Sequence, residues 1–233
     1  MVEIAAQIGF LLVLVVGIPA MSWITASDPQ VRSASRPALY FSAALSEWLF
    51  AGMGLAAVRV ARLGATSLGL RSLPGISFAG WTGLIVLASC AGLLLILALE
   101  RRGWWPAESD LVHLLMPKTR TEKIWALALV APTAALAEEF LYRGYLFSMI
   151  ARTLHSTAWA WGLSSVVFGI AHLYQRPSGM VRAGLLGALL AWPLVRTGSI
   201  YPSVGAHFLI DALAFGWLGA KLLKPPATDN TSL

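Results

Sequence analysis

Long apolar segments recur from one end of this 233-residue chain to the other. Runs of roughly 20 apolar residues are typical of helices that cross a bilayer, because that length of α-helix spans the hydrocarbon core. Charged residues make up only 12% of the chain, against about 25% in average soluble domains. The sequence therefore predicts an all-α fold, a polytopic transmembrane helix bundle, with residues 1–233 forming a single integral-membrane domain.

About seven spans are expected, with six to eight as the range. They are placed at roughly Ile4–Ile24, Ala38–Val58, Trp81–Leu99, a fourth span from Ile124, Thr157–Leu173, Val181–Leu194 and Ile200–Leu218. The segment Glu100–Lys123 mixes Trp with Lys and Arg and is predicted to lie at the membrane interface. The polar tail, residues 221–233, is predicted to be disordered.

The charge of the chain is basic, with a net value of +6. Its Lys and Arg residues fall mostly between the apolar runs, where such residues set membrane topology and contact lipid head groups. Membrane lipid is therefore an expected partner and nucleic acid is not. A single cysteine, Cys90, excludes a disulfide within the chain and a thiolate metal site.

Ionisable residues inside the apolar segments are the strongest functional signal. Glu138 and Glu139 stand side by side in one of these segments, and Arg143 follows four residues after the second. A charge near the bilayer centre costs about 2.5–3.5 kcal/mol on insertion scales, so such residues indicate function by default. Later apolar segments add three more ionisable residues, His172, His207 and Asp211. All six residues are predicted to form one buried polar site.

The spacing of these residues predicts how they face. Glu139 and Arg143 are four residues apart, so they share a helix face and can form an ion pair. Glu138 projects about 100° away from Glu139 and stays available for chemistry. His207 and Asp211 are also four apart, as are Phe168 and His172. Packed together, these helices would bring Glu138, His172, His207 and Asp211 into one polar cavity, as helix bundles do.

At about 1.5 Å of rise per residue, the predicted spans place Glu138 and His207 toward one side of the membrane and His172 toward the other. A later start of the fourth helix, near Pro132, would bring the three side chains to one level.

A carboxylate with two imidazoles indicates hydrolysis. Glu138 would be the general base that deprotonates a water, and His172 would orient or help to activate that water. His207 and Asp211 would stabilise the developing oxyanion. Zinc is the alternative, with Glu138, His172 and His207 as ligands, although the sequence has no His-Glu-x-x-His motif.

Structural roles are the competing interpretation at each position. The Glu139–Arg143 pair could be a neutralised structural pair, and each membrane histidine could make only an interhelical hydrogen bond. Glu47, an acid within the second apolar segment, is interpreted as structural, or as lying near the centre of a span for a reason that the sequence does not reveal.

The three motifs Glu138-Glu139-x-x-x-Arg143, Phe168-x-x-x-His172 and His207-x-x-x-Asp211 occur in this order. As a set they resemble those of the CPBP intramembrane proteases, also called the ABI family, which includes the type II CAAX prenyl endopeptidases. The resemblance covers about residues 124–215, which are the expected protease core. It implies Glu138 as catalytic base, His172 as its partner, and His207 with residue 211 as the oxyanion site. The family often has Asn where this chain has Asp211.

The resemblance leads to three hypotheses for function. The first is an intramembrane endopeptidase of a prokaryotic cell membrane, acting on a membrane-associated peptide or protein, with no cofactor required in its metal-free form. The second is a non-enzymatic membrane protein of the same fold, such as a bacteriocin immunity factor or scaffold. The third is a proton or ion carrier that uses the same acids and histidines as a relay.

Overall fold

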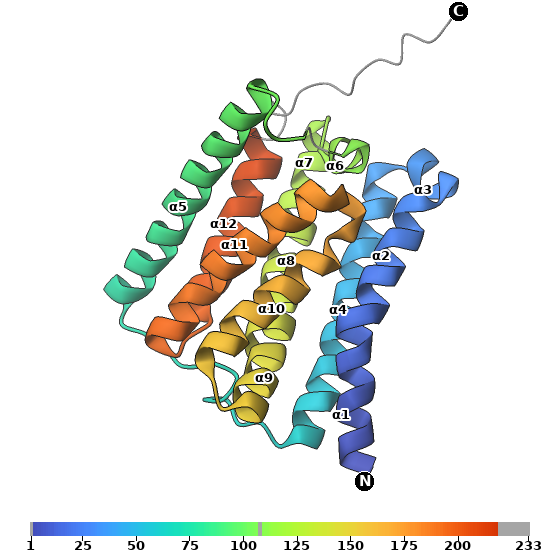
Figure 1. Ribbon diagram of the computed structural model, residues 1–233. Helices are drawn as coiled ribbons and strands as arrows, with labels where there is room; N and C mark the ends of the chain where they lie inside the picture. The colour runs from blue at the N-terminus through green and yellow to red at the C-terminus, as the bar shows by residue number, and fades with distance from the viewer. Residues whose placement is uncertain (1, 107–108, 219–233) are drawn as a thin grey trace, which may run out of the picture.

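The computed structural model describes residues 2–106 and 109–218, and these are arranged as helices joined by short connectors (Figure 1). The tail that was predicted to be disordered, residues 221–233, lies outside the described residues. The first half contains α1 (Val2–Leu12), α2 (Ile18–Ser27), α3 (Pro29–Ser33), α4 (Arg36–Ala61) and α5 (Gly75–Arg101). The second half contains α6 (Asp110–Leu115), α7 (Arg120–Trp125), α8 (Ala131–Glu138), α9 (Phe147–Leu154), α10 (Thr157–Ala171), α11 (Arg176–Thr197) and α12 (Tyr201–Leu213).

Wider, π-helical turns join several of these helices into longer ones. They occupy Val13–Gly17, Ala126–Val130, Glu139–Leu146 and Ala214–Leu218, and a 3-10 turn lies at Leu173–Gln175. As a result α1 and α2 form one continuous rod, and α7, α8 and α9 form another.

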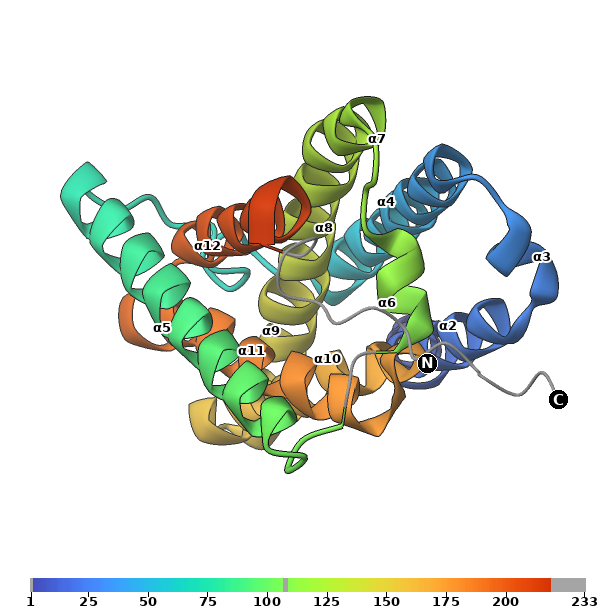
Figure 2. The ribbon, with the colours of Figure 1, turned by 90° about the horizontal axis from the view of Figure 1, so that it is seen from above.

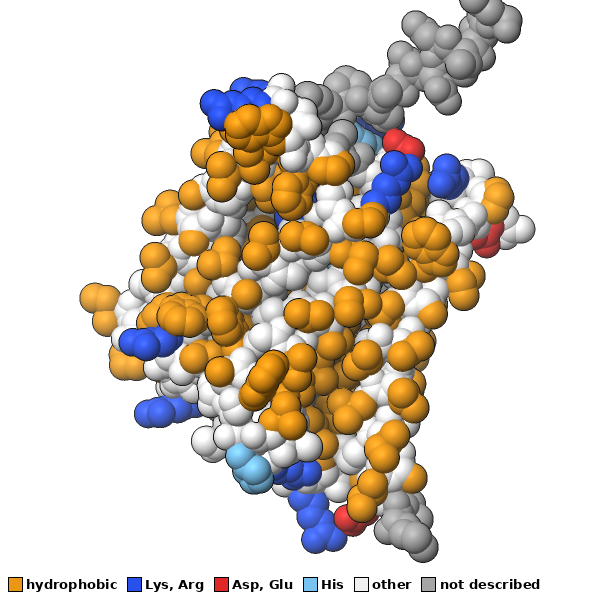
Figure 3. All heavy atoms as spheres, in the orientation of Figure 1, with side chains coloured by type: hydrophobic (Ala, Val, Ile, Leu, Met, Phe, Trp, Pro, Cys, Tyr) orange, Lys and Arg blue, Asp and Glu red, His pale blue; other side chains and the backbone are white. Residues whose placement is uncertain are grey.

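Five helices in the described part of the chain are long and apolar enough to cross a membrane. They are Glu3–Ser27, Arg36–Ala61, Gly75–Arg101, Arg120–Leu154 and Leu173–Thr197. Each contains one of the predicted spans, so these helices indicate a multi-pass integral membrane protein. Hydrophobic side chains cover the flank seen in Figure 3, with Lys and Arg toward its ends, which is the pattern that a lipid belt requires.

The other two predicted spans are shorter in the structure. Thr157–Leu173 corresponds to α10, an apolar helix that ends at Ala171. Ile200–Leu218 corresponds to α12 and its π-helical continuation. Both are helical as predicted, while a total of about seven membrane crossings stays a prediction.

The fourth helix begins earlier than the sequence predicted. It starts at Arg120, so neither Ile124 nor the later start near Pro132 is correct. The reason is a capping box: the Thr119 side chain accepts a hydrogen bond from the Glu122 backbone N–H, and the Glu122 carboxylate accepts from the Thr119 N–H. This reciprocal pairing satisfies the first free N–H groups of a helix.

The middle of the rod formed by α7, α8 and α9 lies inside the bundle. Seen from above, it stands among α4, α10, α11 and α12, with α5 on the outside of α11 and α12 (Figure 2). Contacts of α8 with both α4 and α12 agree with this view. The middle of the rod carries Glu138 and Glu139 and is therefore surrounded by other helices.

The connector between α4 and α5 fixes the start of α12. Gly69 has a φ of +70°, and a Cβ there would lie 2.6 Å from Leu194 and 2.8 Å from Ile200. Only glycine adopts this backbone conformation freely and leaves room for so close an approach. The Ile200 N–H donates to the Gly69 carbonyl at 2.9 Å, which holds the turn that leads into α12.

Candidate active site

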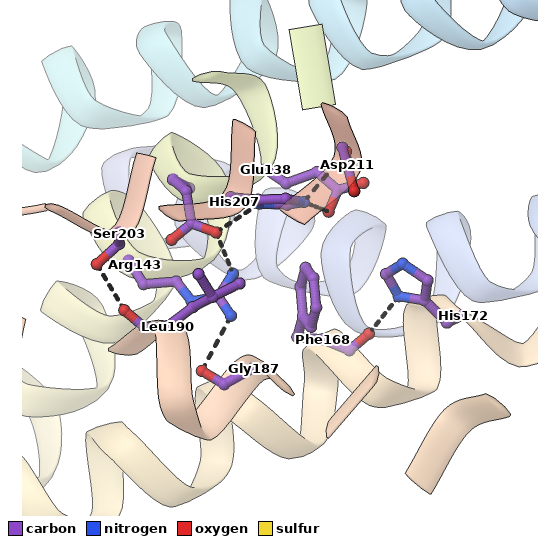
Figure 4. Close-up of polar contacts among 10 residues, drawn as sticks. Glu138, Arg143, Phe168, His172, Gly187, Leu190, Ser203, His207 and Asp211 are labelled. Carbon is purple, nitrogen blue, oxygen red and sulfur yellow. Dashed lines mark hydrogen bonds and ion pairs between the residues drawn. The ribbon is translucent and has the colours of Figure 1, made fainter. Parts of the chain in front are cut away.

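The site is built around a buried ion pair on the π-helical segment Glu139–Leu146. Arg143 Nη1 lies 2.9 Å from Glu139 Oε1, and the two side chains expose 1% and 0% of their surface. The Arg143 Nη2 atom donates to the Gly187 carbonyl at 3.0 Å, and the guanidinium lies 4.2 Å from the centre of the Phe168 ring (Figure 4). The predicted Glu139–Arg143 pair is confirmed, and its neighbours satisfy the hydrogen bonds that a buried pair needs.

Glycine at position 187 of α11 permits this approach. A Cβ at Gly187 would lie 3.0 Å from the Phe168 ring and 3.3 Å from Arg143 Nη2. Both distances are tighter than ordinary van der Waals contacts, so a larger residue would displace one of the two groups.

His207 of α12 joins this pair directly. Its Nδ1 atom lies 2.8 Å from Glu139 Oε1, and the side chain is buried. Because Arg143 already holds Glu139 as a carboxylate acceptor, Nδ1 of His207 is assigned as the donor. Ser203, one turn earlier in α12, donates to the Leu190 carbonyl of α11 and fixes the rotation of α12. The contact of Nδ1 with the Glu139 carboxylate leaves Nε2 as the ring nitrogen of His207 that is free for chemistry.

The remaining nitrogen of His207 faces two further carboxylates. Its Nε2 atom lies 3.9 Å from Glu138 Oε2 and 3.7 Å from Asp211 Oδ2. The predicted alignment of His207 with Asp211 is therefore confirmed, and Glu138 lies at the same level. An imidazolium at His207 would have a carboxylate beside each nitrogen, with Glu139 on one side and Asp211 on the other.

Exposure separates the two neighbouring glutamates. The Glu138 and Asp211 side chains expose 18% and 24% of their surface, while Glu139 exposes none. Glu138 therefore keeps part of its side chain outside the packed interior and Glu139 does not. Since a general base must come within hydrogen-bonding reach of the proton that it removes, Glu138 fits this role and Glu139 does not.

His172 lies apart from the other histidine. It follows the last residue of α10, its Nδ1 atom is 2.9 Å from the Phe168 carbonyl oxygen, and its ring also packs near Tyr174. The Phe168 ring is 4.7 Å from the His172 ring and 6.3 Å from the His207 ring, centre to centre, and stands between them in Figure 4. The structure thus links His172 to the other site residues through Phe168. The expected difference in level between His172 and the Glu138–His207 pair stays a prediction.

Comparison with family models identifies a domain in the second half of the chain. Residues 120–213 match the model of the Rce1-like type II CAAX prenyl endopeptidases. These residues form an Rce1-like CAAX prenyl endopeptidase domain. The match confirms the resemblance that the three motifs indicated, and its range lies close to the expected core at 124–215. Neither the curated proteins nor the solved structures include a match to this chain.

The Rce1-like domain contains all six residues that the sequence singled out, but the structure adds one from outside it. Glu47 of α4 is half-buried, and its Oε2 atom is buried without a hydrogen-bond partner among the described residues. Glu138, His207 and Asp211 lie close enough to act on it electrostatically. Its position within an apolar segment was the available signal, and the sequence alone did not identify these neighbours.

Metal binding by the Rce1-like domain stays a hypothesis. Within residues 2–106 and 109–218, no group of three or more His, Cys, Asp or Glu side chains is arranged to hold a metal ion. For the predicted ligands Glu138, His172 and His207, the placement of Phe168 beside both imidazoles is a geometric obstacle to a shared ion.

Proposed function

We propose that this chain is an intramembrane endopeptidase that hydrolyses a peptide bond of a membrane-associated peptide or protein. The observation that carries the proposal is the difference between the two adjacent glutamates. Glu139 is sealed by Arg143 and His207, whereas Glu138 lies beside the same imidazole and remains partly exposed. The Rce1-like domain at residues 120–213 supports a peptidase.

In the proposed reaction, Glu138 takes a proton from a water molecule, and the resulting hydroxide attacks the carbonyl carbon of the peptide bond. His207 donates from Nε2 to the oxyanion, and Asp211 stabilises the imidazolium or, when protonated, donates a second hydrogen bond. Collapse of the intermediate breaks the C–N bond, and Glu138 returns its proton to the leaving amine. The products are a carboxylic acid and an amine.

His172 has a supporting role in this proposal. Its Nδ1 atom is occupied by the Phe168 carbonyl, which leaves Nε2 to orient the water or the substrate from the other side of the Phe168 ring. The preferred mechanism needs no cofactor, and zinc held by Glu138, His172 and His207 is the alternative.

The surroundings are part of the same proposal. We infer that α10 and α12 also cross the bilayer, giving about seven spans, and that a polar cavity reaches Glu138 and Asp211. Lipid and a peptide substrate are the proposed partners, and a prokaryotic cell membrane is the proposed location.

Peptide cleavage in proteoliposomes tests the proposal. A set of quenched fluorescent peptides, half carrying a farnesylated cysteine, is incubated with wild-type protein and with the Glu138→Gln variant. We expect wild-type protein to cleave at least one peptide and Glu138→Gln to lose the activity by a factor of about 10²–10⁴. Size-exclusion chromatography and thermal unfolding check that the variant is folded.

Two results would count against an endopeptidase. Equal cleavage by the folded Glu138→Gln variant would exclude Glu138 as the base. Proton flux across the same liposomes that depends on Glu138, without cleavage of any peptide, would support the carrier hypothesis instead.

A further inference from the structure

Glu47 reaches the site from α4, outside the Rce1-like domain. The neighbouring Trp48 donates from Nε1 to the Thr133 hydroxyl of α8 at 3.1 Å, which fixes how α4 rotates against α8. The Oε2 atom of Glu47 is buried and has no hydrogen-bond partner among the described residues. Glu138, His207 and Asp211 are near enough to act on it electrostatically.

With Glu47 included, the site holds more acidic than basic side chains. Besides Glu47, the carboxylates of Glu138, Glu139 and Asp211 lie around one imidazole, His207. An isolated buried carboxylate is costly unless it is paired or protonated.

The nearest fixed cation cannot neutralise this excess. Arg143 is occupied by Glu139, by the Gly187 carbonyl and by the face of the Phe168 ring. If all four acids were ionised, they would outnumber Arg143 and an imidazolium at His207, so a further cation would stabilise their ionised form.

A ligand can supply this cation because two of the acids are partly exposed. Glu138 and Asp211 expose 18% and 24% of their side-chain surface, while the Glu47 Oε2 atom is buried and has no hydrogen-bond partner among the described residues. Charge-assisted hydrogen bonds from an ammonium or guanidinium group are among the strongest that a carboxylate can accept.

We propose that Glu47, Glu138 and Asp211 bind a cationic side chain of the substrate, a lysine or an arginine, close to the peptide bond that is cut. This inference rests on the proposed endopeptidase function and narrows it to peptides with a basic residue near the cleavage site. Glu47 then determines specificity, and Glu138 serves both as the base and as part of the binding surface.

Binding and cleavage of matched peptides test this inference with the full chain in nanodiscs. One labelled peptide carries lysine and its partner norleucine, which has the same aliphatic stem without the ammonium. A second pair carries arginine and citrulline, which distinguishes guanidinium from ammonium recognition. All peptides are acetylated at the amino terminus, so that the side chain is the only basic group compared.

For wild-type protein we expect one of the charged peptides to bind at least about tenfold more tightly than its neutral partner, a difference of about 1.4 kcal/mol. The Glu47→Gln variant should reduce this ratio to about twofold, and the ratio of kcat/KM values should fall in parallel. If Glu47 had a purely structural role, Glu47→Gln would weaken the binding of both peptides of a pair alike. The charge-matched control is Glu3→Gln, which removes an acid from an exposed ion pair with Arg62 and should keep the wild-type ratio.

Equal binding of charged and neutral peptides by wild-type protein would overturn the inference, and so would an unchanged ratio in Glu47→Gln. A preference for the charged peptide that appears only after a chelator is added would also overturn it, because a metal ion would then occupy the acids. Affinity is measured separately from cleavage, so the basic-residue preference can fail while cleavage that depends on Glu138 persists.

Discussion

Replacing Arg143, the arginine of the buried ion pair, should greatly lower the free energy of unfolding of this protein. Arg143→Met keeps an unbranched side chain in place but deletes the guanidinium that contacts Glu139, the Gly187 carbonyl and the Phe168 ring. Glu139 exposes none of its surface, so its carboxylate would stay buried without a cation. Breaking a buried pair in this way costs about 3–5 kcal/mol, and we expect a loss in that range.

A double variant separates the ion pair from simple loss of packing. In Glu139→Gln/Arg143→Met the buried charge is absent, and the Gln side-chain oxygen can still accept from Nδ1 of His207. The Gly187 carbonyl lies inside α11 and loses only the additional hydrogen bond from Arg143, which costs about 0.5–1.5 kcal/mol. The double variant should therefore be more stable than Arg143→Met alone.

The assay is unfolding by SDS in mixed micelles, followed by the fluorescence of the 10 tryptophans of the chain. Arg62→Met is the control, because it breaks an ion pair whose side chains expose 84% and 66% of their surface, and its stability should stay near that of wild type. A loss below about 1 kcal/mol in Arg143→Met, or a double variant as unstable as the single one, would refute the reasoning.

Two further substitutions test packing and the oxyanion site. Gly187→Ala should lower the free energy of unfolding by about 1–3 kcal/mol, because the new methyl would lie 3.0 Å from the Phe168 ring. A Cβ at Gly83 in α5 would have no atom within 4 Å, so Gly83→Ala should instead raise the free energy of unfolding by about 0.5–1 kcal/mol. Equal effects of the two substitutions in SDS titration would contradict this packing. Asp211→Asn should retain peptide cleavage within about tenfold of wild type, because an amide still donates a hydrogen bond, while Asp211→Ala should lose a factor of about 10²–10³. Equal cleavage rates in the two Asp211 variants would remove residue 211 from the oxyanion site.

The helical spacing of residues within one segment could be read from the sequence. Four-residue separations predicted the contacts of Glu139 with Arg143 and of His207 with Asp211, and both are present. Such predictions succeed because side chains four residues apart lie on the same face whatever surrounds the helix. The contact of Glu139 survives even though the segment from Glu139 is π-helical, which nothing in the sequence signalled.

Contacts between helices were harder to predict. The position of Phe168 between His172 and His207 depends on how α10 packs against α11 and how α11 packs against α12. The contribution of Glu47 depends on the rotation of α4, which the hydrogen bond of Trp48 fixes. Packing of this kind is set by the whole bundle, so the sequence could mark these residues as unusual without placing them.

The most direct test of the account compares the two adjacent glutamates in a single experiment. Single-turnover cleavage of one peptide is measured with wild-type protein, Glu138→Gln and Glu139→Gln, and each rate is divided by the folded fraction of that protein. The account predicts that Glu138→Gln loses at least about a hundredfold in rate, because it removes the base. Glu139→Gln should lose stability and retain a larger share of its rate per folded molecule. Greater loss of rate in Glu139→Gln than in Glu138→Gln would contradict the assignment of Glu138 as the base.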